Sequence, residues 1–447
     1  MKVCIIGGGA GGRSASGRIR QLDKEAQIDV FTNQSEIGYA PCELPFVLRG
    51  SIVTWEDIFY PGDFFKERQI NLHVNTEVTD ILKEEKLIIA GGESYAYDKA
   101  ILSLGAIPSI PPIPGLDGRN EFTLSTNIAD ARTLGTVIPR YASAAVIGAG
   151  AIGIEIILAL MAQGYRSLYL LDIMENILPA SLDKDMTGKI EAVMRQKGVE
   201  VILPARINSV RRKSTRKCLI LPDRELEVDF IFFATGVKPN VGLVQKAGLQ
   251  IGSTGAVAVN DYLQTSDPDI YAVGDCMENW DVITGSKTRR LMVTTAGITG
   301  EVAATNLVLG NTIPYQGTAM TFIIEIFGHQ LGSVGFTERL ARENGLDVVS
   351  HITTTLSTRP KYGRKPISCK LIAERGARNL VGAQVISKAS IRGAIDELAL
   401  AIACKIPLDK LAQLDTPYSP AVGGDQVRWT VRELMNKAIA ASDVPAY

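Results

Sequence analysis

Cysteine and histidine are scarce in this chain, whose 447 residues include six cysteines and three histidines. No two cysteines form a CxxC or CxxxxC pair, and they stand at Cys4, Cys42, Cys218, Cys276, Cys369 and Cys404. Zinc and iron–sulfur sites need closely spaced ligands, so we expect no metal site. Cys4, Cys369 and Cys404 stand in apolar strand-like or helical contexts, and we predict that each is buried as a small hydrophobic side chain.

A strong net charge and long apolar runs are lacking as well. The 47 basic and 48 acidic residues nearly cancel, which argues against nucleic-acid binding and leaves room only for a small local basic site. Apolar stretches such as 152–161 are shorter than the ~20 residues of a membrane span. Residues 3–6 form an apolar strand followed by glycines instead of a signal peptide, so we expect a cytoplasmic protein without a membrane span.

The same pattern of apolar strand, glycine turn, helix and second strand occurs twice, at residues 3–31 and 145–172. Such βαβ units predict an α/β fold with two Rossmann-like dinucleotide-binding domains. Four prolines within the seven residues 108–114 indicate a connector out of the first fold. From about Thr321 the strand and helix patterns lack a glycine fingerprint, which predicts an α+β third domain that serves as an interface.

These changes of pattern predict three domains. The first comprises residues 1–112 and 241–320, because the chain returns to it through 270–275 after leaving the second fold at 234–236. The second comprises residues 113–240, and the third residues 321–447. In the third domain we expect strands at 322–327, 367–373 and 380–386 and amphipathic helices at 391–403 and 426–441.

Each glycine turn has the GxGxxG form, with the residues Gly7, Gly9 and Gly12 in the first and Gly148, Gly150 and Gly153 in the second. These glycines allow a tight turn and a close backbone approach, and the helix N-terminus attracts a pyrophosphate. Glu155 follows the second turn, and Asp172 ends the next strand, 22 residues after Gly150. An acid at that spacing binds ribose hydroxyls and repels a 2′-phosphate, which favours NADH over NADPH.

The segment 265–275, TSDPDIYAVGD, resembles the second FAD motif of the pyridine nucleotide-disulfide oxidoreductase family. The resemblance implies that Asp275 bonds the ribityl chain of FAD, and that Gly105 and Gly236 lie in the exits of the FAD and NAD folds. It covers essentially the whole chain. Where the family usually has an acid for the flavin-side ribose, this chain has Thr32 and Asn33, whose neutral side chains can still bind ribose hydroxyls.

Residues 38–45, GYAPCELP, resemble the cysteine segment of the single-cysteine branch of this family, which includes coenzyme A-disulfide reductases, NADH oxidases and persulfide reductases. The glutathione-type second cysteine is replaced by Val47, so Cys42 must act alone. The resemblance implies that Cys42 lies beside the flavin at a helix start, where the dipole lowers its pKa. Pro45 fits the first turn of that helix.

Further residues are implicated by the same resemblance. Arg18 and Arg20 follow the first fingerprint, where coenzyme A-disulfide reductases contact the coenzyme, and two guanidinium groups could hold a phosphorylated substrate; a solvated helix face is the alternative. Tyr362 and Tyr418 fall near tyrosines that these enzymes contribute from the partner subunit. A homodimer through the third domain is expected, because the segment from about Thr321 has apolar strands and helices but no cofactor motif.

The leading hypothesis is an enzyme in which NADH, FAD and Cys42 reduce a small disulfide, persulfide or oxygen species. A second hypothesis is an electron-transfer subunit with an iron–sulfur partner, in which Cys42 is unimportant; the altered residues around Cys42 motivate it. A flavin-binding protein without turnover is a third, which the intact second glycine fingerprint disfavours.

Overall fold

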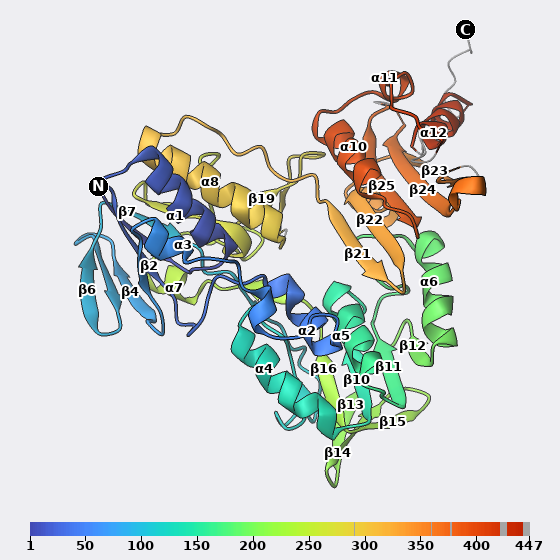
Figure 1. The fold of residues 1–447 in the computed structure, drawn as a ribbon, viewed down its shortest axis with the longest axis horizontal. Helices are drawn as coiled ribbons and strands as arrows, with labels where there is room; N and C mark the ends of the chain where they lie inside the picture. Colours follow the sequence, from blue (N-terminus) through green and yellow to red (C-terminus); the bar gives the residue numbers. More distant parts are fainter. Residues whose placement is uncertain (290, 359, 376–377, 421–426, 441–447) are drawn as a thin grey trace.

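Three five-stranded sheets, each accompanied by helices, organise the chain (Figure 1). The computed structural model describes residues 1–289, 291–358, 360–375, 378–420 and 427–440. In Figure 1 the first sheet lies at the left, the second at the bottom centre and the third at the upper right. The fold class predicted from the sequence is confirmed: two Rossmann-type α/β units precede an antiparallel C-terminal unit.

The first sheet is entirely parallel, in the order β18-β7-β1-β2-β3. Its strands are β1 (Lys2–Ile6), β2 (Gln27–Phe31), β3 (Asn71–His73), β7 (Lys99–Leu102) and β18 (Ile270–Ala272). Helix α1 (Ala10–Leu22) and the long helix α8 (Val293–Leu309) run side by side (Figure 1). They approach so closely that a Cβ on Gly300 would lie 2.3 Å from the Gly11 carbonyl oxygen. The chain therefore returns to the first sheet after building the second, as its sequence suggests.

The second sheet repeats the parallel design in the order β12-β11-β10-β16-β9. Its strands are β9 (Glu121–Phe122), β10 (Ser143–Ile147), β11 (Ser167–Leu171), β12 (Val199–Ile202) and β16 (Phe230–Phe233). Strand β10 is buried along its whole length, because parallel sheets are covered on both faces. Helix α5 (Ala151–Ala162) is apolar on nearly every side and is mostly buried. Helices α4 (Ile128–Val137) and α6 (Lys184–Gln196) complete this unit.

Two three-stranded antiparallel sheets accompany the parallel ones. One contains β4 (Val78–Leu82), β5 (Leu87–Ala90) and β6 (Glu93–Ala96). The other contains β13 (Ser209–Lys213), β14 (Arg216–Ile220) and β15 (Glu225–Val228). The remaining short elements are α2 (Leu44–Arg49), α3 (Phe64–Glu67), α7 (Gly242–Lys246), β19 (Asn279–Trp280) and β20 (Lys287–Thr288).

The two chain segments that connect the parallel units pair with each other. Strand β8 (Ala106–Pro108) and strand β17 (Val237–Pro239) form an antiparallel ribbon. Hydrogen bonds from Ser109 N to Gly236 O (3.0 Å) and from Asn240 N to Gly105 O (3.0 Å) extend the pairing at both ends. The proline-rich connector and the second exit thus run together. The exact domain limits proposed from the sequence remain a prediction.

The C-terminal sheet is antiparallel, in the order β21-β22-β25-β24-β23. Its strands are β21 (Phe322–Ile326), β22 (His329–Gly335), β23 (Val348–Leu356), β24 (Pro366–Glu374) and β25 (Leu380–Ser387). Its helices are α9 (Glu338–Glu343), α10 (Arg392–Ala403), α11 (Leu408–Leu411) and α12 (Arg428–Ala440). The three strands and two helices expected there are present, although Gln426 and Ala441 lie outside the described residues. Strands β22 and β23 were not anticipated.

Cysteine burial matches the prediction at two of the three positions. Cys4 and Cys369 are buried, whereas Cys404 is exposed, because it caps the C-terminus of α10 and does not continue its apolar face. Among the described residues, none of the helices combines the length and apolar character that crossing a membrane requires.

Candidate active site

The first glycine turn joins β1 to α1 and is formed as the fingerprint requires. Gly7 adopts a positive φ of 110°, and a Cβ there would lie 2.0 Å from the Ser103 carbonyl oxygen. A Cβ on Gly12 would lie 1.9 Å from the Gly7 carbonyl oxygen. A Cβ on Gly9, the N-cap of α1, would have no neighbouring atom within 4 Å. The first and third glycines therefore permit the turn, and the second leaves open space in which a pyrophosphate fits.

The second turn reproduces this geometry almost atom for atom. Gly148 has a φ of 108°, and its Cβ would lie 2.2 Å from the Ala234 carbonyl oxygen. A Cβ on Gly153 would lie 1.9 Å from the Gly148 carbonyl oxygen, and Gly150 meets nothing within 4 Å. The chain thus contains two cradles of one design, each at the N-terminus of a helix that favours an anionic group.

The residues that end the second strand differ between the two folds. The Asp172 carboxylate accepts hydrogen bonds from the backbone N–H groups of Ala149 (2.7 Å) and Met174 (2.9 Å). It is thereby held against the second glycine turn. In the first fold Thr32 is buried and its hydroxyl accepts from Gln34 N (3.2 Å), whereas Asn33 is exposed. Of this pair, Asn33 has the side chain that is free to reach a ribose.

Asp275 lies in a 3-10 turn, Gly274–Cys276, directly after β18. Burial raises the pKa of its carboxyl group to about 6. No hydrogen bond to this carboxylate is found among the described residues, so its acceptors remain available for a polar ligand group. Gly105, in the exit after β7, has a φ of 66°, and Gly236, in the matching exit, has a φ of 91°. Gly9, Asn33 and Asp275 are therefore residues that could hold an FAD.

Cys42 lies in a 3-10 turn, Pro41–Glu43, that leads into the six-residue helix α2, with Pro45 in its first turn. The residue is solvent-exposed overall, although neighbouring atoms partly cover its sulfur. Ile37, which directly precedes the cysteine segment, packs against the first glycine turn: a Cβ on Gly8 would lie 2.7 Å from Ile37 Cδ1. Gln163, just after α5, donates a hydrogen bond to the Leu48 carbonyl oxygen (3.2 Å), so α2 also contacts the second unit. The cysteine segment therefore bridges the two nucleotide folds.

The sequence predicted a lowered pKa for the Cys42 thiol, and this is wrong as far as the groups of the protein itself are concerned, because together they raise it. Packing around the sulfur raises the pKa of Cys42, and the charges of Glu43 and Glu155 raise it further, whereas a backbone hydrogen bond only partly opposes them. Burial likewise raises the pKa of Glu155, to about 7. A short helix gives little dipole, and two nearby carboxylates oppose the thiolate. A cation or a dipole of a bound group would shift the balance towards the thiolate.

A pocket of about 260 Å³ lies beside α1, next to the first glycine turn. It is lined by Arg13, Ser14, Gly17, Arg18, Gln21, Phe64, Arg68 and Glu301. Arg13 and Arg68 both stack on the Phe64 ring, with their guanidinium carbons 4.1 and 4.2 Å from its centroid. Burial lowers the pKa of Arg13, and the charge of Arg68 lowers it further, although Tyr60 opposes this. The pocket thus presents two guanidinium groups in contact with one aromatic ring.

The two arginines predicted from the sequence have different roles. Arg18 lines this pocket, and its Nε donates to the Thr305 hydroxyl on α8 (3.1 Å). Arg20 is absent from the lining. It donates to backbone carbonyl oxygens of Arg68 (2.9 Å), Gln69 (3.0 Å), Asp23 and Lys24, which ties the end of α1 to the segment after α3.

Comparison with known proteins accounts for this arrangement. The family model described as pyridine nucleotide-disulphide oxidoreductase matches residues 1–300, and the corresponding dimerisation-domain model matches residues 324–428. The chain belongs to the pyridine nucleotide-disulphide oxidoreductase family. Members of this family are flavoproteins, and the chain is an FAD-dependent NAD(P)H oxidoreductase with a dimerisation domain.

Two curated relatives and one solved structure show how extensive the similarity is. An NADH oxidase of Methanocaldococcus jannaschii is 34% identical, over 94% of this chain and 95% of the relative. An NAD(P)H sulfur oxidoreductase (CoA-dependent) of Pyrococcus abyssi is 32% identical, over 94% of each chain. The structure of an NAD-dependent persulfide reductase from A. fulgidus is 32% identical with a TM-score of 0.94, over 98% of this chain and 84% of that one. These comparisons do not favour the electron-transfer-subunit hypothesis.

The two tyrosines predicted for the site lie in the dimerisation domain of this oxidoreductase. Tyr362 ends a 3-10 turn between β23 and β24, and both it and Tyr418 are exposed. The Lys361 amine lies 5.0 Å from the centre of the Tyr362 ring.

Arg13 and Arg68 were missed by sequence reasoning. Arg13 directly follows the third glycine of the first fingerprint, so its place at the helix start was a usable signal. Arg68 lies 55 residues further on, and only the packing of Phe64 brings it to the same pocket.

Proposed function

We propose that this oxidoreductase uses NADH to reduce a small sulfur substrate that carries phosphate groups, a coenzyme A-type disulfide or persulfide, at Cys42. The names of two relatives, a CoA-dependent sulfur oxidoreductase and a persulfide reductase, support the substrate class. The observation that carries the proposal is the arginine pocket beside the first glycine turn. Oxygen, suggested by the NADH oxidase relative, is the competing acceptor.

The charges of the pocket favour a phosphorylated ligand. Arg13, Arg18 and Arg68 line it together with one acid, Glu301, and Arg68 also pairs with Glu67 (3.5 Å), which is outside the lining. The buried Nε of Arg13 has no hydrogen-bond partner in the described part of the chain. A buried donor without a partner is costly, and an anion would satisfy it. Guanidinium groups bind phosphate oxygens in a bidentate manner, which suits the phosphates of coenzyme A.

At Cys42 the proposed step is thiol–disulfide exchange. The thiol loses its proton, the thiolate sulfur attacks one substrate sulfur, and a new S–S bond forms as the substrate S–S bond breaks; the departing thiolate takes up a proton. When bound, FAD supplies the transfer of two electrons between a nicotinamide and a sulfur. Glu155 acts on the thiol through its charge, so protonation of Glu155 favours the thiolate.

NADH is the proposed donor because of Asp172. Its carboxylate is fixed against the second glycine turn by the two backbone hydrogen bonds described above, and it retains lone pairs for ribose hydroxyls. A 2′-phosphate at that position would meet a negative charge. We further propose a homodimer through the dimerisation domain, in which Tyr362 and Tyr418 of one subunit complete the site of the other.

Replacement of the two exposed cysteines tests the role of the thiol. Cys42→Ser should abolish the reduction of coenzyme A disulfide by NADH while NADH-to-dye electron transfer persists, because the latter needs only the cofactors. The matched control Cys404→Ser removes the other exposed cysteine and should change neither rate. Full disulfide reduction by Cys42→Ser would refute the thiol step. A wild-type enzyme that consumes oxygen and ignores the disulfide would refute the substrate class.

Pantethine, which has the same disulfide but lacks the phosphates, tests the pocket. Arg68→Gln should raise the KM for coenzyme A disulfide at least about tenfold, because a charge-assisted contact is lost. It should leave the KM for pantethine unchanged. An equal effect on both substrates would show that Arg68 maintains the fold and does not bind phosphate.

A further inference from the structure

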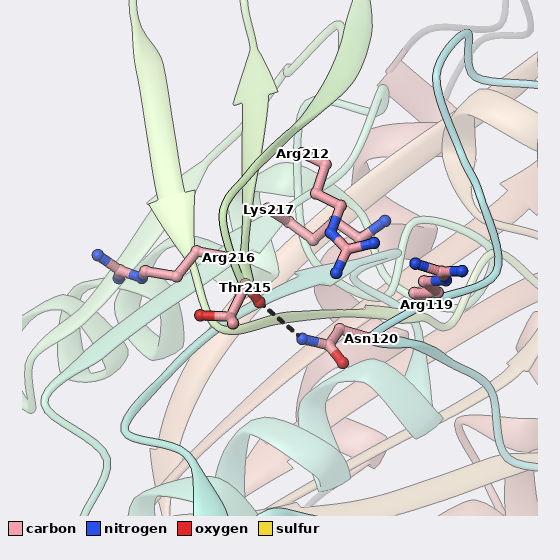
Figure 2. A pocket seen from close by; sticks show the side chains of 6 residues that line it. All are labelled: Arg119, Asn120, Arg212, Thr215, Arg216 and Lys217. Carbon is pink, nitrogen blue, oxygen red and sulfur yellow. Dashed lines mark hydrogen bonds between the residues drawn. The ribbon is translucent and has the colours of Figure 1, made fainter.

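The unit built on the second parallel sheet, the NAD-side unit, contains a second basic pocket of about 290 Å³ (Figure 2). Its lining residues come from the turn before β9 and from the β13–β14 hairpin, and they are Arg119, Asn120, Arg212, Thr215, Arg216 and Lys217. In Figure 2 the ends of Arg212, Lys217 and Arg119 gather on one side, whereas Arg216 extends to the other. Four of the six lining residues are cations, and no role in the proposed reaction uses them.

The pocket is separate from the nucleotide cradle of the same sheet. Asn120 directly precedes β9, and its amide donates to the carbonyl oxygen of Asp229, the residue before β16 (3.0 Å). The pocket therefore lies at the amino ends of these parallel strands. Gly148 lies at the carboxyl end of β10, so the strand from Ser143 to Gly148 separates the two by roughly 16 Å at about 3.3 Å per residue. A ligand in this pocket would not compete with NADH.

Strand register brings two of the cations face to face. Arg212 and Lys217 are direct cross-strand partners in the hairpin. Like charges in such positions are destabilising unless something neutralises them. Lys217 is only 2% exposed and bonds the carboxylates of Asp117 and Glu121. The Nε of Arg212 donates to the Ser214 carbonyl oxygen (2.9 Å).

The carboxylates nearby are already engaged. Glu121 accepts from the backbone N–H of Gly118 (2.9 Å) as well as from Lys217, and it is almost fully buried. The pKa of Asp117 is lowered mainly by its bonds from Lys217 and from the Arg119 N–H, with a smaller contribution from the charge of Arg212. Neither Arg119 nor Arg212 forms an ion pair within the described ranges of the chain.

A net positive charge therefore remains around the pocket. Lys213 and Arg216 share Glu227, and Arg216 also pairs with Asp229. With Lys213 included, five cations face four carboxylates, which leaves one positive charge. Arg119 and Arg212 contribute two positive charges and the paired groups contribute one negative charge, which gives this excess of one. Both arginines are exposed, where a ligand can reach them.

The pocket is also held open by its own hydrogen bonds. The Asn120 side chain donates to the Thr215 carbonyl oxygen at the hairpin tip (3.0 Å), the bond drawn in Figure 2, and accepts from the Tyr141 hydroxyl (3.1 Å). This amide fixes the turn against the hairpin. The arginines are thus presented by two anchored segments, which lowers the entropy that binding would cost.

We propose that this pocket binds a phosphoryl group, as inorganic phosphate or as a small phosphomonoester, between Arg119 and Arg212. Two guanidinium forks can each donate two hydrogen bonds to phosphate oxygens. The bound anion neutralises these two guanidinium groups, which form no ion pair within the described residues. This site is independent of the arginine pocket beside α1 and of the proposed substrate.

Calorimetric titration of the FAD-loaded enzyme, saturated with NAD⁺, tests the proposal. Inorganic phosphate and glycerol 3-phosphate are titrated separately at constant ionic strength, and the tighter of the two identifies the form of phosphate that the pocket prefers. Arg119→Gln combined with Arg212→Gln should weaken this binding at least about tenfold, because two charge-assisted contacts are lost. NADH-to-dye activity should stay unchanged.

The matched control combines Arg211→Gln with Arg224→Gln, which removes the same charge from paired, exposed arginines outside the pocket. It should bind phosphate as the wild type does. Hydrogen exchange should show phosphate-dependent protection at 117–121 and 211–217 in the wild type and control only. Equal weakening in both double variants, no phosphate-dependent protection at 117–121 and 211–217 in the wild type, or no saturable binding of either probe would overturn the proposal.

Discussion

Replacement of Lys370 by methionine should loosen the contact between the NAD-side unit and the dimerisation domain. Lys370, on β24, is 2% exposed. Its ammonium lies 3.0 Å from Asp183 and 2.7 Å from Asp185, at the start of α6, and 3.2 Å from Glu338 on α9. Gln384 adds a bond to the Asp183 carboxylate (2.6 Å). One buried cation thus holds three carboxylates from two units.

The size of the effect follows from leaving these carboxylates without their cation. Removing one partner of a buried ion pair typically costs about 3–5 kcal/mol, because the remaining charge is uncompensated. Asp185 is 48% exposed and Glu338 27%, so solvent screens part of the repulsion. We therefore expect the lower end, about 3 kcal/mol at neutral pH.

The pH dependence gives a second check. Burial alone would raise the pKa of Glu338, but hydrogen bonds from Ser350, Arg342 and Lys370 lower it from 4.5 to about 2. A depressed carboxyl pKa stabilises the fold above pH 4.5, and this contribution is lost as the pH falls towards 2. Without Lys370 the carboxylates bind protons more readily. The destabilisation by Lys370→Met should therefore be largest at neutral pH and should shrink in acid.

Urea unfolding, combined with hydrogen exchange at the start of α6, measures this effect region by region. Exchange is needed because a multidomain enzyme need not unfold in two states. Lys184→Met is the matched control, since Lys184 makes one exposed ion pair with Glu175 and should cost less than about 0.5 kcal/mol. If Lys370→Met costs no more than Lys184→Met, or if its cost grows in acid, the cluster does not hold the units together.

Three further outcomes follow from the cofactor side of the structure. Gly12→Ala should release FAD, and Gly153→Ala should abolish NADH binding while FAD stays bound, because each new Cβ would lie 1.9 Å from a backbone oxygen. Absorbance spectra measure the loss of FAD and NADH titration measures the loss of NADH binding. Retention of both ligands would contradict the cradle geometry. Glu155→Gln should lower the pKa of Cys42, seen as faster alkylation at neutral pH, because it removes a charge that disfavours the thiolate; an unchanged alkylation profile would refute that coupling. Asp172→Asn should narrow the preference for NADH over NADPH, measured as the ratio of kcat/KM values, and an unaltered ratio would remove Asp172 from the specificity site.

The sequence predicted the parts of this enzyme that depend on local chain geometry. Both glycine turns and the strand that returns at Ile270 follow from glycine spacing and apolar runs. The electrostatic and hydrogen-bond partners of individual side chains could not be predicted in this way, because they come from distant parts of the sequence. Glu155 lies 113 residues from Cys42, and only the packing of α2 near α5 lets its charge oppose the thiolate. Arg20 was predicted as a substrate ligand. Its guanidinium group donates to the carbonyl oxygens of Arg68 and Gln69, and no local sequence pattern indicates these distant contacts.

The ribbon of β8 and β17 determines how the NAD-side unit can move. A domain joined by one strand can swivel freely about that strand, whereas two antiparallel strands bonded side by side resist torsion and yield mainly by bending. The NAD-side unit should therefore move by bending at this ribbon and not by twisting about it. The distance between the cradles at Gly9 and Gly150 would then change, whereas their relative rotation about the ribbon would not. A protease cut at the exposed Ile110 would leave β17 in place as a continuous connection, and the two units would stay joined after cleavage.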